Sequence, residues 1–166
     1  MTDITTSPRI DVRTISQPDE LAMARSLMAQ YGDSLSVDLG FQGFEQELAN
    51  LPGEYVSPDG GLLLAFVDGV AAGCCAFRPL PDVDYANACE MKRLFVTKAF
   101  RGFGLGEQLI EQCMIEARAA GYMHILLDVL EEFETARHLY ANAGFTEVPP
   151  YYYSPITGSQ FLMAQL

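Results

Sequence analysis

A glycine-rich stretch, RGFGLG, joins a strand-like run to a helix-like run in the second half of the chain. The run before it, residues 90–97, has the composition of a strand, and strict alternation would turn Leu94 and Val96 away from the face of Met91. The run after it, residues 104–120, repeats small and apolar side chains at helical spacing. This order predicts a strand, a tight turn and a helix with one buried face.

The position of the three glycines, Gly102, Gly104 and Gly106, predicts an anion site. The first N–H groups of a helix have no partner within the helix and lie at the positive end of its dipole, which suits a phosphate group. Glycine lets the backbone approach the ligand closely, and Arg101 adds a fixed cation. The alternative is a tight turn with a close contact between helix and strand.

The remaining periodicity predicts a mixed sheet with helices on its faces. A strand over residues 9–14 precedes helices over 17–31 and 41–51, with Gly32 expected to end the first. Asp68-Gly69 predicts a tight hairpin between strands 62–67 and 70–77. The later elements are a strand at 125–130, a helix at 132–142, and strands at 145–148 and 160–164. Because 166 residues with 49% hydrophobic content suit one core, residues 1–166 are expected to form a single domain.

Charge and cysteine usage exclude several classes of function. The formal net charge of -12 repels nucleic acid and anionic membranes, and either serves solubility or suits a cationic substrate. The polar opening, MTDITTSPRI, has no leader pattern, and no apolar run is long enough to span a membrane, so a soluble cytoplasmic protein is expected. Four cysteines without ligand spacing are expected to be reduced and buried, with no metal site.

Two motifs together resemble the GCN5-related N-acetyltransferase (GNAT) superfamily. Arg101-x-x-Gly104-x-Gly106 is similar to its R/Q-x-x-G-x-G/A loop, and ARHLYANAGF, residues 136–145, is similar to its A-x-x-L-Y-x-x-x-G-F segment. EMKRLFV, before the loop, resembles the family's fourth strand. The resemblance implies an α/β fold, with a mostly antiparallel sheet of about seven strands, helices on both faces, and splayed fourth and fifth strands.

The resemblance also implies acetyl-CoA as co-substrate and transfer to a primary amine by direct attack, through a tetrahedral intermediate. The pantetheine arm would pair with the backbone of the fourth strand, and the N–H of Val96 would stabilise the oxyanion. Arg101 and the loop amides would hold the pyrophosphate. The cofactor-binding residues implied are Leu94, Phe95, Val96, Arg101, Gly102, Phe103, Gly104, Leu105, Gly106 and Glu107.

Two catalytic residues follow from the same resemblance. Tyr140 matches the tyrosine that protonates the departing thiolate, although its helical register also suits core packing. Glu90 resembles the general base of the histone acetyltransferases in the superfamily, although it could equally be a strand-end carboxylate paired with Lys92 or Arg93. Phe133 departs from the family, because many members have asparagine at this place.

The acceptor implied by the resemblance is a small-molecule or peptide amine, and the negative net charge would suit a cationic one. One of Tyr151, Tyr152 and Tyr153, in a proline-bounded loop, is expected to line the substrate pocket, unless the run is a packed loop or a dimer contact. Residues 32–50 would form the opposite wall. Other interpretations remain open: an acetyl-CoA-binding sensor with little turnover, or a protein-interaction module. The oligomeric state is likewise open, and a homodimer through the final strand is one form.

Overall fold

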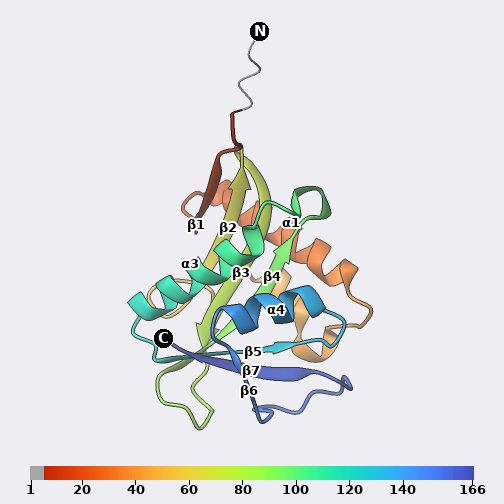
Figure 1. The fold of residues 1–166 in the computed structure, drawn as a ribbon, viewed down its shortest axis with the longest axis vertical. Helices are drawn as coiled ribbons and strands as arrows, with labels where there is room; N and C mark the ends of the chain where they lie inside the picture. Colours follow the sequence, from red (N-terminus) through yellow and green to blue (C-terminus); the bar gives the residue numbers. More distant parts are fainter. Residues whose placement is uncertain (1–5) are drawn as a thin grey trace.

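The computed structural model describes residues 6–166, so residues 1–5 of the polar opening lie outside the described part. Its strands form one seven-stranded sheet, which confirms the predicted size of about seven strands (Figure 1). The order of the strands in the sheet is β1-β2-β3-β4-β5-β7-β6. All neighbouring strands are antiparallel except β4 and β5. The strands are β1 (Ile10–Thr14), β2 (Gly61–Val67), β3 (Val70–Pro79), β4 (Ala88–Val96), β5 (His124–Val129), β6 (Thr146–Val148) and β7 (Gln160–Gln165).

Helices cover both faces of the sheet, as predicted. Helices α3 (Leu105–Ala119) and α4 (Glu134–Asn142) lie in front of the sheet in Figure 1, and α1 (Pro18–Ser34) packs on the other face. The two apolar cores divide in the same way, so the adjacent cysteines Cys74 and Cys75 belong to different cores. All four cysteines are buried and free, as expected. Among the described residues, no helix has the length and apolarity of a membrane span.

Two helix boundaries differ from the predictions. Helix α1 continues through Gly32 and Asp33 to Ser34, because a single glycine inside a helix with a buried face is tolerated. The helix expected over residues 41–51 is divided into a 3-10 turn, η1 (Gly40–Gln42), and the short helix α2 (Phe44–Ala49). Gly43 separates them with a φ of 69°, in the left-handed region that favours glycine.

The sheet opens between its fourth and fifth strands. Parallel pairing covers only Ala88–Glu90 of β4 against His124–Leu126 of β5. Beyond those residues the strands diverge, and in Figure 1 β4 runs steeply whereas β5 and β7 cross the lower part of the molecule. The predicted splay is therefore present, and the second half of β4 has a free edge.

The strict alternation of side chains predicted along residues 90–97 is wrong, because a β-bulge at Arg93 interrupts it. The register with β3 shifts between Cys74 and Ala76, and Arg93 has a φ of 63°. The extra residue reverses the alternation, so Leu94 packs on the same core as Met91. A left-handed φ is costly for arginine, by about 1–3 kcal/mol, and persists only where surrounding contacts hold it.

Candidate active site

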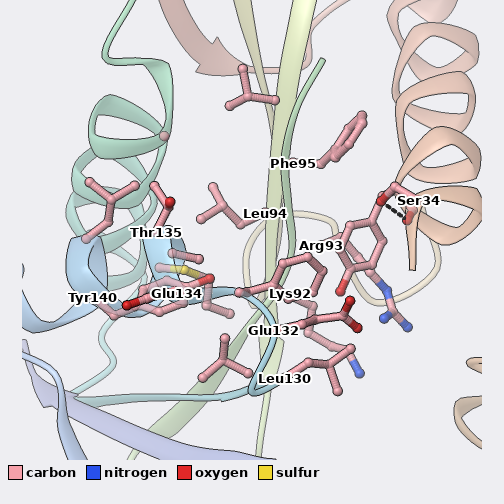
Figure 2. Close-up of a pocket in the computed structure, with 18 of the residues that line it drawn as sticks. Ser34, Lys92, Arg93, Leu94, Phe95, Leu130, Glu132, Glu134, Thr135 and Tyr140 are labelled. Carbon is pink, nitrogen blue, oxygen red and sulfur yellow. Dashed lines mark hydrogen bonds between the residues drawn. The ribbon is translucent and has the colours of Figure 1, made fainter. Parts of the chain in front are cut away.

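A cavity of about 770 Å³ occupies the gap between β4 and β5. Its walls come from β4, the end of β5, the start of α3, helix α4, and the segment from α1 to η1. Figure 2 shows Leu94 and Phe95 pointing to opposite sides of β4, as consecutive residues of a strand do. The volume lies in the range of sites that hold a cofactor or drug-sized ligand.

The free edge of β4 presents backbone groups to this cavity. The N–H of Thr97 donates to the carbonyl of Ala72 at 2.9 Å, on the side of β3. Because backbone groups alternate sides along a strand, those of Val96 and Leu94 point toward the gap. The Val96 carbonyl accepts from Arg101 Nε at 3.3 Å, which agrees with this direction. An extended ligand could therefore pair with β4 as an added strand.

The glycine loop ends the same cavity with unpaired amides. Gly102 and Gly104 have φ values of 95° and 74°, which glycine adopts without strain. The first bond of α3 runs from Gln108 N–H to the Gly104 carbonyl at 3.2 Å. Within residues 6–166, the N–H groups of 102–107 donate to no protein acceptor, so the helix start can bind an anion.

The third glycine serves the packing of two helices. A Cβ on Gly106 would lie 3.0 Å from Leu139 Cδ1 of α4, whereas a Cβ on Gly102 or Gly104 would meet nothing within 4 Å. Gly106 therefore allows α3 and α4 to approach, and both helices line the cavity. The close contact proposed as the alternative for the glycine loop does occur here, but between two helices.

Tyr140 lies on α4, beside the cavity and 7% exposed. Its ring packs edge-on against Phe145 at 5.6 Å between centroids, so the core-packing role predicted for this helix is real. Burial raises the pKa of Tyr140 well above its usual value. The phenol is therefore protonated at neutral pH and can donate a proton into the cavity.

Glu90 lies at the last paired position of β4 with β5, and its side chain is 2% exposed. Its Oε1 atom accepts from Arg78 Nε at 3.0 Å, and its Oε2 atom accepts from the Tyr151 hydroxyl at 2.6 Å. It is not among the residues that line the cavity. A catalytic role for Glu90 stays a prediction. Its closest ionic partner is Arg78, the predicted pairing with Lys92 occurs at 4.0 Å between Nζ and Oε1, and Arg93 pairs with Glu47 instead.

The tyrosine run lies behind the cavity wall. Tyr151 reaches Glu90, and the Tyr152 hydroxyl donates to Asp128 Oδ2 at 2.7 Å and accepts from Gln42 Nε2 at 3.3 Å. Tyr153 is 88% exposed. None of the three belongs to the lining of the described cavity, but Asp128 and Gln42 do. The tyrosines thus position lining residues, and Ile156 is the residue of their loop that lines the cavity.

One end of the cavity depends on side chains that the sequence did not single out as site residues. Arg93 pairs with Glu47 of α2 through Nε at 2.8 Å, donates to Gln42 Oε1 at 3.0 Å, and lies over the Phe44 ring. Burial and Glu47 oppose each other, and the pKa of Arg93 is raised. These contacts attach residues 40–49 to the bulge of β4. No local signal could have found them, because about fifty positions separate the partners.

Comparison with known proteins agrees with this geometry. A sequence model described as the acetyltransferase (GNAT) family matches residues 23–145. An uncharacterised N-acetyltransferase of Schizosaccharomyces pombe is 32% identical over 158 residues, covering 95% of each chain.

Solved structures share the fold. An acetyltransferase from Streptococcus agalactiae superposes with a TM-score of 0.74 at 20% identity, covering 95% of this chain and 98% of its own. A Salmonella typhimurium structure with its cofactor acetyl-CoA gives a TM-score of 0.68 at 19% identity, covering 94% and 93%. At these identities the likeness concerns the fold alone.

Proposed function

The chain belongs to the acetyltransferase (GNAT) family and is an N-acetyltransferase, and from that premise we propose that it moves the acetyl group of acetyl-CoA to a primary amine. One observation carries the proposal. The free backbone edge of β4, the unpaired amides of residues 102 and 104–107, and Tyr140 all border the same cavity. A ligand with an extended arm and a pyrophosphate fits this arrangement, and the Salmonella structure holds such a molecule.

The cofactor half of the site is built mainly from backbone. Leu94 and Val96 pair with the pantetheine arm, Phe95 lies between them, and Arg101 with the amides of Gly102–Glu107 holds the pyrophosphate. The Val96 N–H is the proposed donor to the thioester oxygen. A donor fixed there stabilises negative charge as the amine attacks, without reorganising at that moment.

Tyr140 protonates the sulfur as the carbon–sulfur bond breaks. Its raised pKa keeps the proton on the phenol at neutral pH, so Tyr140 is present as a hydrogen-bond and proton donor when negative charge develops on the sulfur. Phe133, which also lines the cavity, supplies no hydrogen bond from its side chain at the place where many relatives have asparagine. The proposal therefore places the whole proton transfer to sulfur on Tyr140.

The amine must lose a proton before it attacks, and Glu90 is the proposed base. Glu90→Gln should then lower the rate with an altered acidic limb of the kcat/KM profile, while acetyl-CoA affinity stays unchanged. Asp128→Asn is the matched comparison, because Asp128 is the carboxylate that lines the cavity on β5. If Asp128→Asn alone removes the acidic limb, the base is Asp128 and the proposed role of Glu90 is wrong.

The test of the proposed function is titration calorimetry with acetyl-CoA, followed by a thiol-release assay with small-molecule and peptide amines. Binding with amine-dependent release of coenzyme A supports the transferase. Binding without release from any amine would favour the acetyl-CoA sensor, and absence of binding would contradict both.

A further inference from the structure

The end of the cavity opposite Tyr140 contains two buried cations. In Figure 2, Lys92 and Arg93 lie on the α1 side of β4, across the strand from Tyr140. Their side chains are 8% and 2% exposed, and both residues line the cavity. Cations are rarely buried in proteins unless they are paired, so the partners of each one decide what it can do.

The two cations differ in their partners. All three nitrogens of Arg93 donate hydrogen bonds, Nε and Nη2 to Glu47 and Nη1 to Gln42. Lys92 Nζ has one long hydrogen bond, 3.3 Å to Gln42 Oε1, an acceptor that it shares with Arg93. Glu90 Oε1 lies 4.0 Å from Lys92 Nζ and already accepts from Arg78.

Lys92, which lines the cavity, therefore has N–H groups that remain able to donate hydrogen bonds to a ligand. An ammonium has three N–H donors, and among the described residues only one of them has an acceptor within hydrogen-bond distance. Burial lowers the pKa of Lys92, although Glu90 opposes that change. An anion from a ligand would restore the missing partner and stabilise the charged form.

We propose that Lys92 binds a carboxylate carried by the acceptor, so that the acceptor is an amino acid or a related amine with an acidic group. This rests on the proposed function and names the substrate class of the same site. A carboxylate fits better than a phosphate, because Glu90 and the lining residues Asp128 and Glu132 would repel a dianion. The same carboxylates suit the ammonium of a zwitterion, whose net charge of zero meets no long-range repulsion from a protein of net charge -12.

A binding test needs no turnover. With coenzyme A present, calorimetry compares a panel of N-acetyl amino acids with their N-acetyl amides, which differ only in the carboxylate. The protein should prefer at least one of the acids, by a factor on the order of ten, the effect of one well-placed ion pair. Lys92→Met should remove the preference. Lys98→Met is the matched control, because Lys98 is the other lysine of the chain and is exposed.

A kinetic test uses the corresponding free amino acids and amino acid amides. Lys92→Met should raise KM for the acids and leave the amides unchanged, with acetyl-CoA affinity as in the wild type. The proposal is overturned if acids and amides bind equally, if no acid binds, or if Lys92→Met lowers kcat for both, which would place Lys92 in proton transfer. If acetyl-CoA itself does not bind, the proposed function fails first, so the two failures are distinguishable.

Discussion

One end of the cavity is formed by backbone groups and the other end by side chains. The proposed cofactor end consists of backbone groups: the free edge of β4 and the amides of residues 102–107. The proposed acceptor end consists of side chains from distant segments: Gln42 and Glu47 meet Arg93, and Tyr152 meets Asp128. A backbone site tolerates most side-chain changes except at its glycines, whereas a side-chain site changes with each residue.

The comparison predicts that damage at one end leaves the other intact. The largest effect should come from Tyr140→Phe, which removes the phenol hydroxyl and keeps the ring packing against Phe145. Loss of the proton donor should lower kcat by about 10²–10⁴. Steady-state kinetics measures the change in kcat. Calorimetry measures the acetyl-CoA affinity, which is expected to stay within about twofold of the wild type. Tyr153→Phe, at an 88% exposed position, is the control, and an unchanged kcat in Tyr140→Phe would contradict the role.

A change at the cofactor end should weaken acetyl-CoA binding. Gly104→Ala forces a φ of 74° on alanine at the start of α3, which displaces the amides and should reduce affinity by about tenfold or more. Gly43→Ala is matched in strain, because Gly43 precedes α2 with a φ of 69° and is also free of neighbours within 4 Å. Calorimetry should find acetyl-CoA affinity unchanged in Gly43→Ala. Equal losses in both variants would mean that the effect is general instability.

A change at the acceptor end should leave acetyl-CoA binding intact. Glu47→Gln removes the charge that pairs with Arg93, which should cost about 1–3 kcal/mol of unfolding free energy and raise the acceptor KM several-fold. Urea denaturation and kinetics with saturating acetyl-CoA measure the two effects. Loss of acetyl-CoA affinity in this variant would break the division between the two ends.

The smallest effect on function should come from an ion pair outside both ends. Arg13 and the N–H groups of Ser16 and Gln17 lower the pKa of Glu20 from 4.5 to about 2. A lowered folded pKa contributes stability above about pH 4.5, and that stability is lost as the pH falls toward 2. Urea denaturation at several pH values should show that the free energy of unfolding falls by about 2 kcal/mol over this range. In Glu20→Gln the free energy of unfolding should depend less on pH over the same range. Activity at pH 7 should not change; a changed KM would contradict the assignment.

The same division explains what the sequence could predict. The glycine loop and the hairpin of β2 and β3 depend on local patterns, namely the closely spaced glycines Gly102 and Gly104 and the Asp68-Gly69 turn, so both were accessible. The bulge at Arg93 was not, because a run of strand-forming residues carries no mark of an extra residue. The partners of Lys92 and Arg93 were also inaccessible, since Gln42 and Glu47 are brought to them only by the fold.

Hydrogen exchange followed by mass spectrometry tests directly whether backbone amides hold acetyl-CoA. We expect saturating acetyl-CoA to slow exchange in peptides covering residues 94–96 and 102–107, with little change across α2. Protection confined to the acceptor end, or no protection at the glycine loop despite binding, would contradict the proposed role of these amides.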